Sequence, residues 1–89
     1  MVWKVELSSE ADRELKKLDP QHARRILEFL HKRVATLGDP RSIGAASRGS
    51  RLGEFWRYRV GPYPVVCKIE DDRLMVLVLR IGHRKDIYR

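Results

Sequence analysis

The sequence lacks the covalent and membrane anchors that often stabilise very small proteins. Cys67 is the only cysteine among 89 residues, which excludes a disulfide framework. No apolar run is long enough to cross a bilayer, and no signal-peptide core follows Met1. We therefore expect a cytoplasmic protein without membrane contact, in which residues 1–89 form a single domain around a small hydrophobic core.

The sequence also lacks any cluster of metal-ligating side chains. No group of Cys, His, Asp and Glu residues has the spacing of a metal site. His22 and His31 fall on the polar flanks of a helical pattern, as is typical of surface residues. Cys67 lies in an apolar strand, where a core residue is more common than a nucleophile. The sequence therefore predicts no metal and no cofactor.

Positive charge is what the sequence has in excess, with a net charge of +7. Residues 41–60 contain five arginines and one glutamate, and residues 80–89 contain four basic side chains and one acidic one, whereas the remaining residues are neutral in sum. This distribution favours one basic face that binds a polyanion or an acidic protein. A basic surface that is merely solvated is the alternative.

Hydrophobic periodicity predicts helices in the first half of the chain. Alternation over residues 2–7 predicts a strand, and apolar residues at three- and four-residue steps predict helices over 9–18 and 20–37. Asp19 and Pro20 are a typical start of the second helix, as N-cap and first helical residue. The two helices should form a hairpin with a shared apolar side.

The second half of the chain changes to a period of two. Three strands are predicted, over residues 54–60, 65–70 and 73–81, joined by tight turns. The last of them is so apolar that we expect it to be buried on both faces. With the N-terminal strand, the pattern predicts an α+β fold: a sheet of about four antiparallel strands, with the helical hairpin on one face.

The first strand of this meander separates two kinds of side chain. Trp56 and Tyr58 should point to the helices, whereas Arg57 and Arg59 should point to the opposite face of the sheet. Two adjacent guanidinium groups repel unless an anion binds them. The groups that together resemble an RNA-binding site are Arg48, Arg57, Arg59, His83, Arg84, Lys85, Tyr88, Phe55 and Tyr63.

These side chains suit RNA chemistry. Guanidinium groups bind phosphate bidentately, and aromatic rings stack on unpaired bases. When the ribose 2′-OH attacks its own phosphate, cleavage needs only in-line positioning, proton removal and stabilisation of the developing charge. His83 is a natural proton carrier near neutral pH, and Tyr88 is the alternative if cations favour its ionised form. A purely structural role, in which the Tyr88 ring packs on the sheet, is also open.

Two segments resemble the RelE family of bacterial toxins, within the RelE/ParE superfamily. They are residues 48–61 and 78–89, the second ending in Gly-His-Arg-Lys-Asp-Ile-Tyr-Arg, after the strand-helix-helix pattern. The resemblance implies the toxin of a type II toxin–antitoxin pair: a metal-independent endoribonuclease, or mRNA interferase, that cuts mRNA in the ribosomal A site and inhibits translation. It also implies a cognate antitoxin, RelB-like or of another family, and contact with operator DNA only through the antitoxin complex.

The resemblance assigns roles to individual positions. Arg57 and Arg59 match paired basic residues, Arg84 matches an arginine that stabilises the transition-state phosphate, and Tyr88 matches a base or stacking residue. The implied catalytic residues are therefore Arg57, Arg59, Arg84 and Tyr88. The implied RNA- or phosphate-binding residues are Arg48, Arg51, His83 and Lys85.

One turn departs from the family pattern. Relatives commonly have Gly-Asp-Tyr-Arg where this chain has Gly-Pro-Tyr-Pro at residues 61–64. The arginine of that turn contacts phosphate in the family, and Pro64 cannot replace its charge or its hydrogen bonds. Two alternatives therefore stay open: a ParE-like inhibitor of DNA gyrase, and a weakened toxin that acts mainly as corepressor with its antitoxin.

Overall fold

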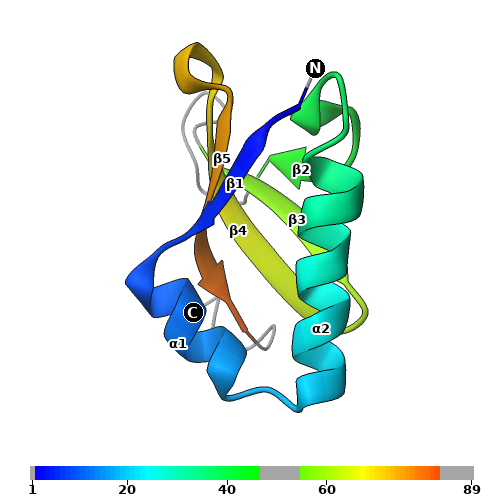
Figure 1. Ribbon diagram of the computed structural model, residues 1–89, viewed down its shortest axis with the longest axis vertical. Coiled ribbons are helices and arrows are strands. Elements are labelled where there is room, and N and C mark those ends of the chain that lie inside the picture. The colour runs from blue at the N-terminus through cyan, green and yellow to red at the C-terminus, as the bar shows by residue number, and fades with distance from the viewer. Residues whose placement is uncertain (1, 47–54, 83–89) are drawn as a thin grey trace.

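Two helices and five strands make up the main elements of the fold (Figure 1). The computed structural model describes residues 2–46 and 55–82. Within these ranges no helix has both the length and the apolar character needed to cross a membrane. The elements are β1 (Lys4–Leu7), α1 (Ser9–Lys16), α2 (Pro20–Glu28) with a π-helical extension (Phe29–Val34), a 3₁₀ turn (Pro40–Ser42), β2 (Ala45–Ala46), β3 (Trp56–Val60), β4 (Tyr63–Glu70), a second 3₁₀ turn (Asp71–Arg73) and β5 (Met75–Ile81).

The two helices begin at Ser9 and at Pro20. The Ser8 hydroxyl accepts a hydrogen bond from the Ala11 amide at 3.0 Å and caps α1. Pro20 opens α2, although the Asp19 side chain makes no capping hydrogen bond. Figure 1 shows α2 as the long helix beside the sheet, with α1 near its lower end. The predicted helical hairpin is therefore confirmed.

The sheet differs from the prediction in the number and direction of its strands. Its order is β1-β5-β4-β3-β2, and β1 runs parallel to β5 while the other pairs are antiparallel. The α+β class is confirmed, but the expectation of an all-antiparallel, four-stranded sheet is corrected. Alternation of apolar residues shows which face is buried and not which way a strand runs. The added strand, β2, contains only Ala45 and Ala46 and has no alternation.

One face of the sheet packs against both helices, and we call it the covered face. Ile26 of α2, Leu30 of its π-helical extension and Leu15 of α1 contribute to a single buried cluster with the strands. The strand side chains of this face are each less than a tenth exposed, and they are Tyr58, Val60, Val65, Cys67, Ile69, Val76 and Val78. The helical and strand periodicities therefore meet in one core, as the sequence predicts.

Strand β5 is buried less evenly than its apolar sequence suggests. Val76 and Val78 are fully buried, whereas Leu77 and Leu79 are only half buried. An irregularity in the pairing with β4 inserts one residue before Arg80, so that Ile81 returns to the covered face. The prediction of a strand buried on both faces is therefore wrong at Leu77 and Leu79.

A loop from the end of the helices closes over the edge of the covered face. The Tyr58 hydroxyl donates a hydrogen bond to the Pro40 carbonyl at 2.6 Å, and the Trp56 indole Nε1 donates to the Ile43 carbonyl at 2.8 Å. Gly44 follows with a positive φ of 82°, a conformation that glycine adopts readily. The aromatic residues of β3 therefore fasten residues 40–44 to the sheet.

Candidate functional site

The sheet face opposite the helices carries a row of basic side chains, and we call it the open face. Residues paired across neighbouring strands point to the same side of a sheet. The register pairs Arg57 with Val66 and Arg59 with Pro64 between β3 and β4, and it pairs Val66 with Arg80 between β4 and β5. The cations of the open face are Arg57, Arg59 and Lys68. Arg80 occupies the same side in the register, but its guanidinium binds the carboxylate of Glu14 in α1.

The two arginines of β3 lie where the alternation predicts. Tyr58 and Val60 are buried in the covered face, while Arg59 is exposed and Arg57 is half buried. Residues two apart in a strand are separated by about 7 Å, so both guanidinium groups can reach one chain of phosphates. The predicted placement of Arg57 and Arg59 is confirmed, and their chemical role stays a prediction.

Most of the other candidates cannot be placed. Arg48, Arg51, His83, Arg84, Lys85 and Tyr88 lie outside the described residues. Tyr63 is described, and it is paired with buried Val60 and packs against His22 of α2, with ring centroids 5.2 Å apart. Tyr63 therefore belongs to the helix side of the sheet, and the expectation that it joins the basic constellation is corrected.

Pro64 lies directly beside Arg59 on the open face. The Gly82 amide donates to the Pro64 carbonyl, with an N···O distance of 3.4 Å, so this carbonyl points toward β5. In an antiparallel ladder the backbone nitrogen of a residue points to the same side as its carbonyl. The Pro64 nitrogen therefore faces β5, and because it carries no hydrogen it cannot donate a hydrogen bond there. Compared with an arginine at this position, Pro64 provides no cation on the open face and no hydrogen-bond donor toward the end of β5.

Glu14 of α1 contacts β5 although its sequence position did not predict this. Its carboxylate accepts from Arg80 through Nη2 at 3.0 Å and Nε at 3.2 Å, and from the backbone amide of Ile81 at 2.8 Å. Glu10, one helical turn earlier, lies 3.8 Å from Arg80 Nε. Glu10 and Glu14 are four residues apart and therefore lie on the same side of α1. Nothing in the sequence indicated that this side meets β5.

Lys68 was also missed, although β4 contains a usable signal. Lys68 is the basic residue in an otherwise mostly apolar strand, it is exposed, and its partner in the register is Leu77. Alternation between buried Cys67 and Ile69 places Lys68 on the open face. The basic surface therefore continues from β3 onto β4.

Cys67 is a core residue and not a candidate nucleophile. Its side chain is fully buried, and burial raises the pKa of its thiol above the ordinary range, which keeps it protonated. Among residues 2–46 and 55–82, no group of three or more Cys, His, Asp and Glu side chains could hold a metal ion. The described part of the site therefore offers guanidinium and ammonium groups for anion binding.

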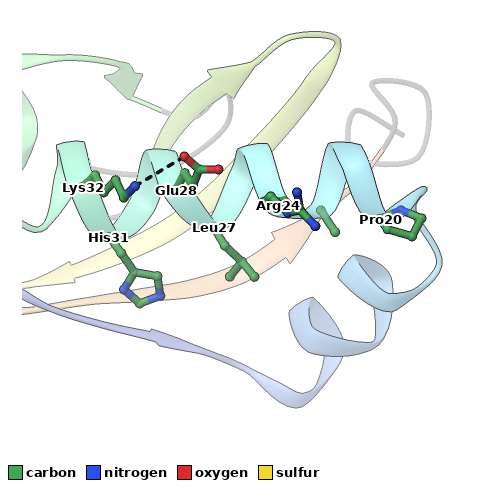
Figure 2. Close-up of a pocket in the computed structure, with 7 residues that line it drawn as sticks. Pro20, Arg24, Leu27, Glu28, His31 and Lys32 are labelled. Carbon is green, nitrogen blue, oxygen red and sulfur yellow. Dashed lines mark ion pairs between the residues drawn. The ribbon is translucent and has the colours of Figure 1, made fainter.

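A second surface feature lies on the helices. A groove of about 480 Å³ runs along an outer flank of α2 and its π-helical extension. Figure 2 shows Leu27 and His31 pointing to the same side of this helix, while Glu28 and Lys32 form an ion pair of 3.6 Å beside them. The groove lining is mainly apolar, and it contains Pro20, Ala23, Arg24, Leu27, Glu28, His31 and Lys32.

A family model described as the ParE toxin of the type II toxin–antitoxin system parDE matches residues 5–88. Toxin RelG of Mycobacterium tuberculosis is 33% identical over 89 residues, which cover 100% of this chain and 99% of the relative.

Solved structures share the fold over nearly the whole chain. A chain of the toxin–antitoxin complex RelBE2 from Mycobacterium tuberculosis has a TM-score of 0.82 and 27% identity, over 94% of this chain and 93% of that chain. A chain of the archaeal RelE–RelB complex from Pyrococcus horikoshii has a TM-score of 0.71 and 24% identity, over 94% and 97% of the two chains. The protein therefore belongs to the ParE toxin family of type II toxin–antitoxin systems, within the RelE/ParE superfamily.

Proposed function

We propose that this toxin is an endoribonuclease that cuts mRNA at the ribosome, inhibits translation in the cytoplasm, and is neutralised by a cognate antitoxin. The observation that carries the proposal is the pair Arg57 and Arg59, side by side on the open face of the sheet. The resemblance to the RelE family expects paired basic residues at these positions. The similarity to toxin RelG and to a chain of the RelBE2 complex supports the antitoxin.

In the proposed reaction the ribose 2′-OH attacks the adjacent phosphate and the 5′-oxygen leaves. Guanidinium groups bind the phosphate oxygens and stabilise the charge that develops in the transition state. Arg57 and Arg59 supply this stabilisation together with Arg84, while Tyr88 removes the proton or stacks on a base. The proposed RNA-binding residues are Arg48, Arg51, His83 and Lys85. The groups named here need no metal ion for this chemistry.

Primer extension on mRNA after induction in a bacterial host tests this function. We expect cuts within codons, and at least a hundredfold loss of cleavage in the double variant Arg57→Ala, Arg59→Ala, on the scale of a lost transition-state donor. The matched control is Arg33→Ala, which removes an exposed arginine of the α2 extension. Intact transcripts in cells whose growth has stopped would exclude the proposal.

A second candidate is inhibition of DNA gyrase by contact. Two observations favour it: the matching family model is that of the ParE toxin, and Pro64 stands where the RelE resemblance expects a phosphate-binding arginine. Induction of the SOS response without mRNA cleavage would select this function. The third account, a weakened toxin that serves as corepressor, expects Pro64→Arg to increase toxicity, and no gain would count against it.

The antitoxin is proposed to cover the open face with an acidic or amphipathic segment. Charge complementarity across such an interface supports both specificity and a fast association rate. The double variant Arg57→Glu, Arg59→Glu should therefore fail to co-purify with the antitoxin, while Arg33→Glu should co-purify normally. Co-purification that is indifferent to both would exclude this surface. Operator DNA would be contacted only through the complex.

A further inference from the structure

The end of β5 is held by groups from outside the sheet. Strand β1 stops at Leu7, which pairs with Val78, so among the described residues no strand pairs with the last residues of β5 on that side. The Ser8 amide donates to the Val78 carbonyl at 2.8 Å, and the Ser8 hydroxyl donates to the Leu79 carbonyl at 3.0 Å. Past this point the backbone of β5 depends on α1 for its hydrogen bonds on that side.

Glu14 binds the residues of β5 that directly follow those bound by Ser8. One carboxylate oxygen accepts the Ile81 amide at 2.8 Å, and the other accepts Nη2 of Arg80 at 3.0 Å. The Glu14 side chain is only 22% exposed, compared with 43% for Arg80. Hydrogen bonds between ionised partners are about twice as strong as neutral ones, and partial exclusion of water strengthens them further. Glu14 therefore binds both the backbone and a side chain of the strand end.

The β4 side of the strand end lacks one donor. Here the Gly82 amide donates a hydrogen bond to the Pro64 carbonyl at 3.4 Å. A residue with an N–H at position 64 could return a second hydrogen bond to Gly82, as paired residues in an antiparallel ladder do. Because proline cannot donate it, the hydrogen bonds that Glu14 of α1 makes at Arg80 and Ile81 support a strand end where β4 offers one donor fewer.

We propose that Glu14 is a positioning residue that fixes the end of β5 at Ile81, two residues before the segment 83–89 in the sequence. This inference rests on the proposed function, because those residues include Arg84 and Tyr88. A displacement of about 1 Å in catalytic groups can reduce a rate by about a hundredfold. Glu14 therefore affects the rate of cleavage through the position of β5, without contacting RNA.

Two substitutions of Glu14 distinguish its hydrogen bond to the Ile81 amide from its ion pair with Arg80. Glu14→Ala removes both contacts, whereas Glu14→Gln keeps an acceptor for the Ile81 amide and weakens the pair with Arg80. The matched control is Asp71→Ala, which breaks the bidentate pair between Arg41 and Asp71, with distances of 2.9 and 3.0 Å, in another part of the molecule. All three variants should be checked for an unchanged fold by circular dichroism.

Amide hydrogen exchange and cleavage kinetics give independent readouts. In Glu14→Ala we expect protection of the Ile81 amide to fall at least about tenfold, the effect of roughly one lost hydrogen bond, while Val76 in the middle of β5 keeps its protection. For mRNA cleavage by the toxin on ribosomes, kcat should fall at least about tenfold with KM changed less than about twofold. Glu14→Gln should retain most of the Ile81 protection and of kcat, and Asp71→Ala should retain all of both.

A further variant tests the role assigned to Pro64. Pro64→Val restores an N–H toward Gly82, so adding it to Glu14→Ala should recover part of the protection and of kcat, as expected for coupled anchors on one strand end. Unchanged Ile81 exchange in Glu14→Ala, or equal loss of protection at Val76 and Ile81, would overturn the anchoring. Normal kcat despite lost Ile81 protection would overturn the positioning role. A wild-type protein that leaves mRNA intact would overturn the proposed function, and the exchange result would still decide the anchor.

Discussion

The covered and open faces of the sheet are built from the same strands and differ in what determines their residues. On the covered face, β3, β4 and β5 contribute side chains that are almost completely buried, such as Tyr58 and Val65. At alternate positions the same strands place Arg57, Arg59 and Lys68 on the open face. Packing requires the first set, whereas adjacent like charges oppose folding slightly. Folding therefore does not account for the cations of the open face, and their proposed role is binding.

The largest expected effect comes from the loop that closes the covered face. A Cβ at Gly44 would lie 2.6 Å from the carbonyl oxygen of Arg57 and 2.8 Å from the Trp56 indole nitrogen, at a φ of 82°. We expect Gly44→Ala to lower the free energy of unfolding by about 3 kcal/mol, from the clash and the backbone strain together. Urea denaturation followed by circular dichroism measures this loss.

Gly38 provides the matched control for that substitution. A Cβ at Gly38 would meet no atom within 4 Å. Gly38→Ala should therefore change the unfolding free energy by less than about 0.5 kcal/mol, as surface substitutions usually do. Equal losses in the two variants would show that the close contact between Gly44 and β3 is not what holds the loop.

Val65 and Val66 compare the two faces with one substitution. They are neighbours in β4, and Val65 is fully buried in the covered face while Val66 is half buried on the open face. Val65→Ala should cost about 2 kcal/mol, because it removes buried apolar surface and leaves a cavity. Val66→Ala should cost less than about 1 kcal/mol. Equal midpoints in urea for the two variants would contradict the division into two faces.

This division could be predicted from the sequence in large part. Period-two alternation in β3 separates Tyr58 from Arg57 and Arg59, because side chains of a strand point to opposite faces in turn. Apolar spacing places Ile26 and Leu30 on the buried side of α2, where both are fully buried. These are local consequences of backbone geometry, and they need no knowledge of which strands are neighbours.

The contacts that depend on strand neighbours could not be predicted. Alternation in β1 does not show that it lies parallel to β5, and only that arrangement brings Glu14 to Arg80 and Ile81. The position of Pro64 beside Arg59 likewise follows from the register. The open face is therefore predictable through the alternation in β3, whereas the support that α1 gives to β5 is not.

Tyr58 gives a smaller effect that depends on pH. Its hydroxyl is buried and donates to the Pro40 carbonyl, and burial raises its pKa above the ordinary range. Tyr58→Phe should cost about 1 to 2 kcal/mol at neutral pH, because the Pro40 carbonyl loses its donor. Thermal or urea unfolding at pH 7 measures this cost.

The same residue should make the wild type less stable in alkali. The folded state keeps the Tyr58 proton while the unfolded state loses it above about pH 10, so the unfolding free energy falls as pH rises, by up to about 1.4 kcal/mol per pH unit. Burial also raises the pKa of Cys67, which adds a decline above about pH 9. Tyr58→Phe should decline less steeply between pH 10 and 11. A decline as steep as in the wild type would show that Tyr58 ionises in the folded state.

The smallest effect on stability is expected on the open face, where the effect on binding should be measurable. Arg59 and Lys68 are both exposed, on neighbouring strands. Each change to alanine should alter the unfolding free energy by less than about 0.5 kcal/mol. Each should also reduce the slope of log affinity against log salt concentration for a single-stranded RNA oligonucleotide by about 0.7, the value for one lost phosphate contact.

Lys32→Ala is the control for this measurement, because Lys32 is equally basic and exposed but lies on α2, paired with Glu28. Fluorescence anisotropy over a range of salt concentrations gives all three slopes. If Arg59→Ala changes the slope and Lys68→Ala does not, the RNA follows β3 alone. If the three variants share the wild-type slope, phosphate is not bound on this face, and its positive charge must instead serve a protein partner.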